Sequence, residues 1–381
     1  LFADNLTGNE ADNVLLGQDG NDVMIGLAGD DTLDGGIGND QLRGDGLPDY
    51  TGPSGNDTLN GGDGNDIMWG GAGVDTFDGG AGIDRVSFFA LNATQGAVVN
   101  LFTQTISNDG FGNAETMVSI ENLGSGTAFA DNFTGDDNAN FIMVGFGDTV
   151  FGNGGDDQVW VDAAPAVIDG GAGIDTIGFT GDTNGMLTPD TNGDGLAELI
   201  FATSGVYVDL TAGYIFDDGF GHEVEISGFE NVDGSELGDT IIGSGTENWL
   251  NGWGGNDVIF GFGGDDIISG GEGDDQLRGD GGTSGLGAFG NDQLYGEGGD
   301  DYLNGGRGVD YFDGGDGLDR VSFYNRSATQ AAVASLVTQT ITNDGFGNAE
   351  SMFSVEGLGA GTQFADQFTG DDGVNFMYAG F

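Results

Sequence analysis

The feature that most constrains this sequence is an aspartate that returns every nine residues over long stretches. Residues 70–87 read GGAGVDTFDGGAGIDRVS, with glycines before each aspartate and an apolar residue two positions after it. One inward residue on a short strand, followed by a glycine turn, is typical of a β-solenoid. The glycine density and the missing 3.6-residue period exclude helices. We therefore predict an all-β fold, a right-handed parallel β-roll or β-solenoid interrupted by irregular β coils.

The repeated aspartates, called ladder aspartates below, fall into three blocks. A step of 17 residues separates Asp40 from Asp57, which indicates an eight-residue insertion, and the third block has a matching one. Asn13 and Asn248 stand where the repeat would otherwise have an aspartate. The ladder aspartates are Asp22, Asp31, Asp40, Asp57, Asp66, Asp75 and Asp84, then Asp157 and Asp175, then Asp257, Asp266, Asp275, Asp292, Asp301, Asp310 and Asp319.

A second repeat, with an offset of 235 residues, overlies the first, because residues 84–137 match residues 319–372. Residues 204–243 form a divergent middle copy. Within the long repeat, GAVVNLFTQTI and ETMVSIENL are predicted as strands and NDGFGN as a turn. We expect the solenoid to continue through these stretches in wider coils; a separate small β-sandwich is the alternative. The predicted segments are a β-roll at 1–87, a strand-rich connector at 88–134, a short β-roll at 135–178, a strand-rich insert at 179–235, a β-roll at 236–322 and a connector at 323–381.

The charge of the chain restricts its partners. Its 381 residues include 64 acidic side chains and only six Lys or Arg, which gives a formal net charge of -58. Phosphate binding needs basic side chains, so nucleic acid is excluded as a partner, and an anionic membrane surface would repel the chain. We also expect no membrane insertion, because no run of 18 apolar residues exists. Self-repulsion on this scale destabilises a compact fold unless bound cations neutralise it.

The nonapeptide has the consensus GGxGxDxUx, in which U is apolar, and its clearest copies are residues 61–69, 70–78 and 79–87. This pattern resembles the calcium-binding repeat of the RTX (repeats-in-toxin, hemolysin-type) family of secreted bacterial proteins. The segments between the blocks more loosely resemble connectors of large RTX proteins. The opening LFADNLTG recurs inside the chain as AFADNFTG. We therefore expect the sequence to be a piece of a longer protein.

The resemblance implies multiple Ca²⁺ ions, each held between loops that stack on the same side of the roll. The ladder aspartates would be the side-chain ligands, and loop carbonyls would supply the other oxygens. This agrees with the chemistry of calcium, which takes six to eight oxygen ligands, and with the positive φ angles that glycine permits. Loops with Asn13 or Asn248 are expected to bind weakly or not at all. The alternative for some aspartates is that they only cap turns.

A different calcium loop is predicted between the second and third blocks. TPDTNGDGLAELIF (188–201) places Asp190, Asn192, Asp194 and Glu198 at positions 1, 3, 5 and 9 of a loop that resembles the start of an EF-hand. Position 12 is Phe201 instead of glutamate, so a calcium loop on a β-hairpin fits better than a full EF-hand. A plain polar turn is the alternative.

The sequence shows no signature of an enzyme. His222 is the single histidine, and the matching turns carry Asn113 and Asn348, so an imidazole is not required there. The nucleophile-elbow, zinc-protease and cysteine-nucleophile patterns are missing from the sequence. We expect no catalytic residues and no catalytic activity in this chain.

Two classes of function remain open. The 235-residue repeat favours a calcium-folded structural or adhesive segment of a large secreted or cell-surface protein, such as a filament, surface layer or adhesin. The alternative is the non-catalytic secretion-and-folding module of a secreted hydrolase, lyase or toxin. The RTX resemblance implies type I secretion and an extracellular or cell-surface location in a Gram-negative bacterium. Possible partners are copies of the chain itself, or surface glycans stacked on Trp69, Trp160, Trp249 or Trp253.

Overall fold

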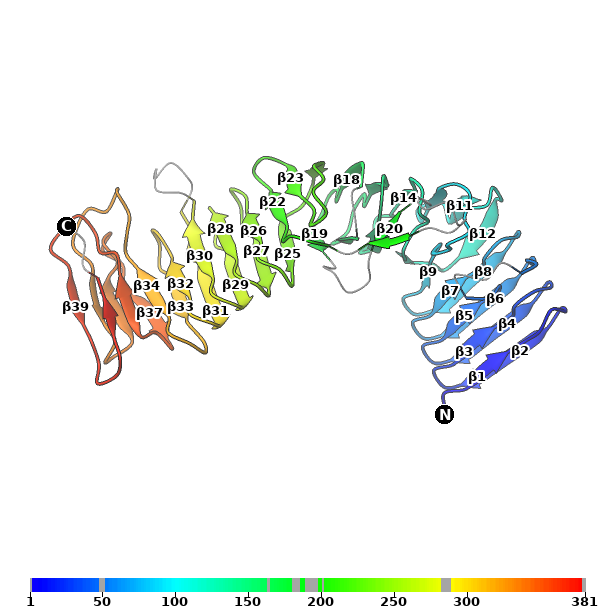
Figure 1. Cartoon of the computed structure of the whole chain (residues 1–381), viewed down its shortest axis with the longest axis horizontal. Coiled ribbons are helices and arrows are strands. Elements are labelled where there is room, and N and C mark those ends of the chain that lie inside the picture. Colours follow the sequence, from blue (N-terminus) through cyan, green and yellow to red (C-terminus); the bar gives the residue numbers. More distant parts are fainter. Residues whose placement is uncertain are drawn as a thin grey trace. The chain divides into compact units, whose positions relative to one another are not determined.

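A computed structural model describes residues 2–47, 52–162, 165–179, 186–188, 198–200, 202–281 and 289–378. All regular secondary structure in these residues is β-strand. The chain divides into two compact units, residues 1–177 with 183–201 and residues 178–182 with 202–381. In each unit, short strands stack as successive rungs of a solenoid (Figure 1). The described residues contain no helix with the length and apolar character of a membrane span.

The first sheet of unit 1 is parallel throughout. Neighbouring strands in the roll are joined in register by residues 18 or 26 apart, such as Met24 opposite Leu42 and Leu42 opposite Met68. The longer spacing shows that the strands before and after the eight-residue insertion keep the register of the stack. The strands, in order of pairing, are β1 (Asn5–Thr7), β3 (Val23–Ile25), β5 (Gln41–Arg43), β7 (Ile67–Trp69), β9 (Arg85–Val86), β13 (Asn122–Leu123), β15 (Phe141–Val144) and β17 (Gln158–Val161).

The second sheet of unit 1 is parallel except for one hairpin. Strand β12 continues the roll beside β8, with Met117 opposite Phe77, and β11 and β10 then pair antiparallel before the parallel stack resumes. The strands, in order of pairing, are β2 (Val14–Asp19), β4 (Thr32–Ile37), β6 (Thr58–Asp63), β8 (Thr76–Ala81), β12 (Glu115–Val118), β11 (Thr105–Asp109), β10 (Ala97–Asn100), β14 (Asn132–Thr134), β16 (Thr149–Phe151) and β18 (Val167–Asp169).

Three strands lie next to the division between the units. The strand β19 (Thr176–Phe179) crosses it. The strands β20 (Met186–Thr188) and β21 (Glu198–Ile200) form a separate antiparallel pair in unit 1.

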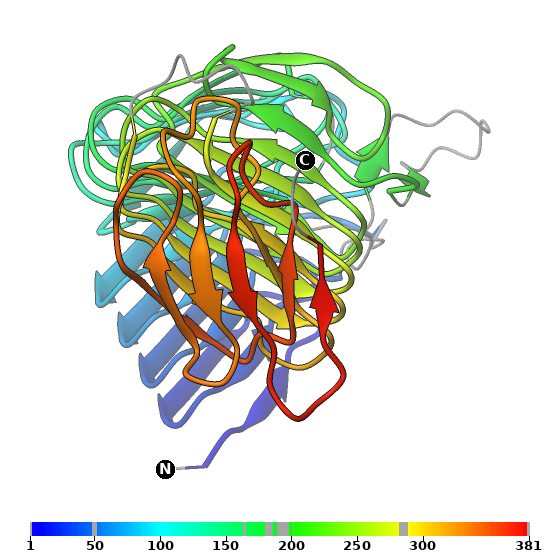
Figure 2. The same cartoon turned by 90° about the vertical axis from the view of Figure 1, so that its left-hand side faces the viewer.

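Unit 2 repeats the same plan. Figure 2 shows the orange and red strands of the last connector in front of the stacked coils of this unit. One sheet contains β25 (Asn231–Ser235), β27 (Trp249–Trp253), β29 (Ile267–Glu272), β31 (Gln293–Gly298), β33 (Tyr311–Asp313), β37 (Glu350–Phe353), β36 (Thr340–Asn343), β35 (Val333–Ser335) and β39 (Gln367–Thr369). The other contains β24 (Val224–Ser227), β23 (Tyr214–Asp217), β22 (Tyr207–Asp209), β26 (Thr240–Ile242), β28 (Val258–Phe262), β30 (Gln276–Asp280), β32 (Tyr302–Asn304), β34 (Arg320–Ser322), β38 (Gly357–Gly359) and β40 (Phe376–Met377).

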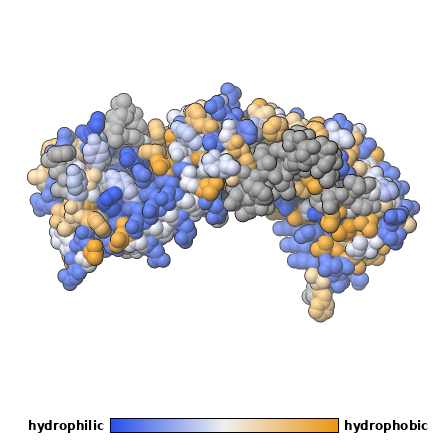
Figure 3. Space-filling view, in the orientation of Figure 1, coloured by the Kyte–Doolittle hydropathy of each residue, from blue (hydrophilic) through white to orange (hydrophobic). Residues whose placement is uncertain are grey.

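The core of each unit is a column of single inward side chains, one per strand. Met24, Leu42, Met68 and Val86 are all fully buried, and they follow one another along the first sheet. These are the residues two positions after each ladder aspartate, so the predicted inward positions are confirmed. Because each coil buries so little apolar surface, its stability depends on the coils above and below it. Apolar side chains also remain on the outer surface (Figure 3).

The connectors continue the solenoid, as predicted. Strands β12 and β13 pair in parallel with β8 and β9 of the roll, so the alternative of a separate β-sandwich is wrong. The prediction of GAVVNLFTQTI as a strand needs correction, because β10 and β11 are separated by a turn at residues 101–104. In this turn the Asn100 side chain accepts the N–H of Thr103 (2.8 Å), and the Gln104 side chain donates to the Leu101 carbonyl (2.9 Å). These side-chain contacts stop the strand.

Candidate metal centres

Each ladder aspartate ties its coil to the preceding coil on the same face. The Asp66 side chain is 1% exposed, and its Oδ1 accepts the main-chain N–H of Asp40 at 2.7 Å. The main-chain N–H of Asp66 in turn donates to Oδ1 of Asp84 at 2.8 Å. The same bond recurs along the rolls of both units, from Asp4 donating to Asp22 up to Asp301 donating to Asp319. One carboxylate oxygen is therefore used in holding neighbouring coils in register.

The second oxygen of these carboxylates is buried and has no hydrogen-bond partner within the described part of the chain. An unpaired buried polar atom costs about 1–3 kcal/mol, and more when it is charged. Such an oxygen must take up a proton or face a cation. This orphaned Oδ2 belongs to Asp22, Asp31, Asp40, Asp57, Asp66, Asp75, Asp84, Asp157, Asp257, Asp266, Asp275, Asp292, Asp301, Asp310 and Asp319.

A main-chain carbonyl oxygen lies beside most of the orphaned oxygens in the rolls. A methyl group added at Gly61 would lie 2.3 Å from Asp66 Oδ2 and 2.6 Å from the carbonyl oxygen of Gly79, one coil further on. At Gly17 the corresponding distances to Asp22 Oδ2 and the Gly35 carbonyl are 2.3 and 2.5 Å. The orphaned carboxylate oxygen and a main-chain carbonyl oxygen thus meet at a space that only glycine leaves open.

This donor set fits calcium and not a softer metal. Calcium combines carboxylates with main-chain carbonyls, whereas zinc needs several His, Cys or carboxylate side chains. No group of three or more His, Cys, Asp or Glu side chains in the described residues could hold a metal ion. Each candidate site must therefore be built mainly from carbonyls, with one ladder aspartate contributing the charge.

Burial raises the pKa of several ladder carboxyls. The pKa of Asp57 rises to about 8 and that of Asp292 to about 9, first because burial disfavours the charged form. Neighbouring carboxylates add to the shift, among them Asp75 next to Asp57 and Asp310 next to Asp292. At neutral pH a cation is the alternative to a proton at these sites.

The family comparison agrees with this geometry. The family model of the RTX calcium-binding nonapeptide repeat, which spans four copies, matches residues 7–42, 51–86, 146–164, 233–261, 263–284 and 286–321. The chain carries RTX calcium-binding repeats. The matched segments cover just under half of the chain and contain nearly all the ladder aspartates. No curated protein matches the sequence significantly.

The RTX ladder includes the predicted aspartates of all three blocks. Asp175 joins it because its Oδ1 accepts the N–H of Asp157 at 2.8 Å. The asparagines behave differently, since Oδ1 of Asn13 accepts the N–H of Asn9 (2.7 Å) and Oδ1 of Asn248 accepts that of Ser244 (2.6 Å). Neither leaves an orphaned oxygen, which supports the prediction that these loops bind calcium weakly or not at all.

The second predicted calcium loop falls largely outside the described residues. The described residues do not include Asp190, Asn192 and Asp194. Only the main chain of Glu198 is described, at the start of β21. Thr188 of β20 pairs antiparallel with Glu198. The loop therefore connects two strands of a hairpin, as predicted, and its calcium binding stays a prediction.

The sequence analysis missed glutamates that take the place of ladder aspartates in the connectors. Glu115 Oε1 accepts the N–H of Asp75 (3.2 Å), and Glu121 Oε2 accepts the N–H of Asp84 (2.9 Å). In unit 2, Glu356 does the same for Asp319 (3.1 Å). Each glutamate precedes an inward apolar residue by two positions, as the ladder aspartates do. That spacing was a usable signal, but the lost nonapeptide period hid it.

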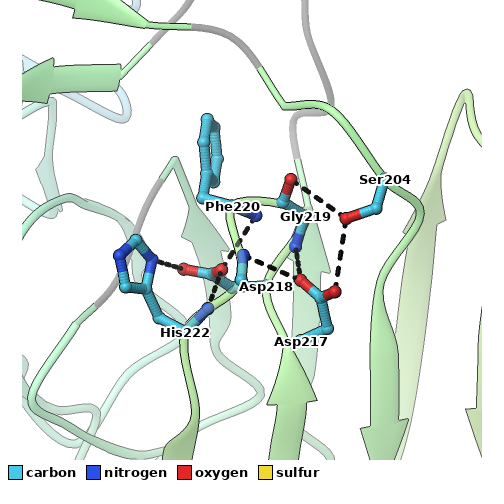
Figure 4. Close-up of polar contacts among 7 residues, drawn as sticks. Ser204, Asp217, Asp218, Gly219, Phe220 and His222 are labelled. Atoms are coloured by element: carbon cyan, nitrogen blue, oxygen red, sulfur yellow. Dashed lines mark hydrogen bonds and ion pairs between the residues drawn. The ribbon is translucent and has the colours of Figure 1, made fainter.

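The turn around the single histidine has a structural role (Figure 4). His222 Nδ1 lies 3.2 Å from Oδ2 of Asp218, whose Oδ1 accepts main-chain N–H groups of the same turn. In the matching turn of the first connector, Asn113 donates its side-chain N–H to Asp109 at 2.9 Å. In the last connector, Asn348 donates its side-chain N–H to Asp344 at 3.0 Å. The histidine thus occupies the position of a turn-closing asparagine.

Proposed function

We propose that this chain is a calcium-folded structural or adhesive segment of a large secreted or cell-surface protein. The orphaned carboxylate oxygens of the ladder support the calcium dependence most directly. Neighbouring strands lie about 4.8 Å apart, and two charges at that distance repel by on the order of 3 kcal/mol at an effective dielectric constant of about 20. A chain with a net charge of -58 therefore folds only when ions between the coils cancel this repulsion.

The observation that carries the structural role is the construction of the same roll and connector twice. β12 docks on β8 with Met117 opposite Phe77, and β37 docks on β33 with Met352 opposite Phe312. Because each connector ends in strands that stack in parallel again, further units can be added without a new kind of contact. Repetition of one unit is what a filament, surface layer or adhesin needs.

The calcium requirement also suits export. Extracellular calcium modules bind at roughly 10⁻⁴–10⁻³ M, far above the calcium level of a cytosol. The chain would stay unfolded inside a Gram-negative cell, pass through a type I secretion system and fold outside. A non-catalytic secretion-and-folding module of a secreted hydrolase, lyase or toxin would use the same property. The histidine with a turn-closing role supports our proposal that this chain is not itself an enzyme.

Copies of the chain and surface glycans are the proposed partners. Trp249 and Trp253 on β27 are 61% and 49% exposed and lie beside Tyr295, so their rings are available for stacking. Trp69 is less suited to this role, because the guanidinium of Arg43 lies 3.7 Å from its ring centre.

The decisive experiment is a calcium titration followed by far-UV circular dichroism at pH 8. The expected result is a transition from coil to β structure at millimolar calcium or below, reversed by EGTA. Equal β content in calcium and in excess EGTA would overturn the calcium-folding proposal. Electron microscopy of the calcium-loaded chain then tests the structural role, since filaments or sheets support it and dispersed particles at high concentration speak for the secretion module.

A further inference from the structure

The ladder has a direction. In the rolls, the orphaned oxygen of most ladder aspartates faces a carbonyl of the following coil, as Asp66 Oδ2 does with the Gly79 carbonyl. Each ion therefore lies between the loop that ends in its aspartate and the next loop on the same face. The last aspartate of a block has no further nonapeptide beyond it. Its oxygen faces the connector.

The first connector supplies the missing group opposite Asp84. A methyl group added at Gly79 would lie 2.0 Å from the carbonyl oxygen of Ser119 and 2.6 Å from Asp84 Oδ2. Ser119 has a φ of +54°, a left-handed conformation that is uncommon for serine. This conformation directs the Ser119 carbonyl to the place that a glycine carbonyl takes in the rolls. Glu121 Oε2 accepts the N–H of Asp84 at 2.9 Å, which is the bond that a ladder aspartate would make.

The same arrangement is built independently in unit 2. A methyl group at Gly314 would lie 2.1 Å from the Ser354 carbonyl oxygen and 2.6 Å from Asp319 Oδ2. Ser354 has a φ of +49°, and Glu356 Oε2 accepts the N–H of Asp319 at 3.1 Å. Two occurrences 235 residues apart show that the geometry belongs to the junction between roll and connector.

The charges at these junctions call for a cation. Asp84 and Asp319 are fully buried, and their Oδ2 atoms have no hydrogen-bond partner among the described residues. Neither aspartate, nor Glu121 or Glu356, forms an ion pair with an arginine in the described part of the chain. Two carboxylates and a carbonyl are hard oxygen donors of the kind that calcium prefers.

We propose that Glu121 and Glu356 each complete an additional Ca²⁺ site at the junction, with Asp84 and Asp319 as partners and the Ser119 and Ser354 carbonyls as further ligands. A glutamate, which is one methylene longer than the aspartate of the rolls, fits this position because fewer residues separate the carbonyl from the carboxylate in the connector than in the rolls. Ser119 stands two residues before Glu121, whereas Gly79 stands five residues before Asp84. This inference rests on the proposed calcium-dependent folding of the rolls. Its consequence is that calcium fastens β13 onto β9, and each connector docks only when its junction ion is bound.

Native mass spectrometry of the calcium-loaded full-length chain tests this directly, because it counts bound ions. Glu121→Gln and Glu356→Gln are each expected to hold one Ca²⁺ fewer than the wild type, and the double variant two fewer. Glutamine can still accept the N–H of Asp84 or Asp319, so the coil should keep its register. Glu10→Gln is the matched control, because it removes the same charge from an exposed glutamate and should keep every ion.

The outcomes separate this inference from the proposed function. Unchanged ion counts in both glutamine variants, with the wild type folding only in calcium, would overturn the junction sites alone. A wild type that folds fully in EGTA would overturn the proposed function itself. Hydrogen exchange on β13 gives a second measurement, since Glu121→Gln should make this strand exchange at least tenfold faster in calcium while β5 remains protected. Equal protection of β13 in both proteins would contradict the fastening role.

Discussion

The proposed calcium sites of the rolls can be tested by placing a single methyl group in one of them. Gly61→Ala is suited to this because the φ of Gly61 is not in the left-handed region, so alanine fits the backbone. The new Cβ would lie 2.3 Å from Asp66 Oδ2 and 2.6 Å from the Gly79 carbonyl oxygen, distances that real Cβ atoms do not show. These oxygens have to move apart, and the methyl then occupies the space intended for the ion.

The expected loss of stability has two parts. Overpacking a filled site typically costs about 1–3 kcal/mol. An ion bound with a Kd of roughly 10⁻⁴–10⁻³ M contributes about 1–2 kcal/mol at about 5 mM calcium, and this is lost as well. The variant should therefore be about 2–5 kcal/mol less stable. For a unit of this size, that lowers the melting temperature by at least about 4 °C.

Gly245→Ala is the matched control for thermal unfolding followed by circular dichroism. An added Cβ at Gly245 meets no atom within 4 Å, and its φ is also outside the left-handed region. Both variants therefore lower the conformational entropy of the unfolded chain to the same extent, which stabilises the protein by about 0.4–1 kcal/mol. Gly245→Ala does this without placing a methyl group in a proposed calcium site. Equal melting temperatures for the two variants would show that the oxygens near Gly61 are not arranged as described.

The calcium dependence of this difference separates a blocked ion site from simple strain. Above the Kd, each tenfold rise in calcium adds about 1.4 kcal/mol to the wild type for the ion that Gly61→Ala cannot bind. The gap between Gly61→Ala and Gly245→Ala should therefore widen with calcium. A constant gap would refute the reasoning that Asp66 and the Gly79 carbonyl share an ion.

Three further predictions follow from the burial, the pKa values and the ladder. Met68→Ala empties a fully buried core position and should cost about 2–5 kcal/mol in urea unfolding at saturating calcium. In EGTA, the raised pKa values of Asp57 (about 8) and Asp292 (about 9) stabilise the fold fully below about pH 4 and cease to do so as the pH rises through 8–9. Circular dichroism in EGTA should therefore show more β structure at pH 5 than at pH 9, and the reverse order would contradict the assigned burial. The side-chain N–H of Asn248 donates to the Glu230 carbonyl at 2.6 Å, and Asn248→Asp replaces this donor by a carboxylate oxygen. The free energy of unfolding of the variant should therefore fall by about 1–3 kcal/mol at low calcium and recover as calcium is raised.

The repeating part of the fold could be predicted because its information is local. Each nonapeptide contains its own glycine turn, its own aspartate and its own inward residue, such as Gly61, Asp66 and Met68. A nine-residue period then places the same residue types on the same face of every coil. The ladder aspartates and the inward column follow from this period without knowledge of any distant contact.

The connectors were harder because their partners are distant in sequence. Glu115 meets Asp75 across 40 residues, and between them the chain forms the hairpin of β10 and β11. No short period links the two positions. The break of GAVVNLFTQTI into two strands likewise depends on the side chains of Asn100 and Gln104, which close a turn that strand propensity alone does not predict.

The sequence alone determined the solenoid, its inward column and the ladder of aspartates, because a fixed period forces identical neighbours onto identical positions. The tertiary structure decided which oxygen of each aspartate is bonded and which is left without a partner, and that the orphaned oxygen faces the following coil. It also decided that Ser119 and Glu121 stand opposite Asp84. These facts depend on how one coil lies against the next, and the geometry of a stack is set only when the coils meet.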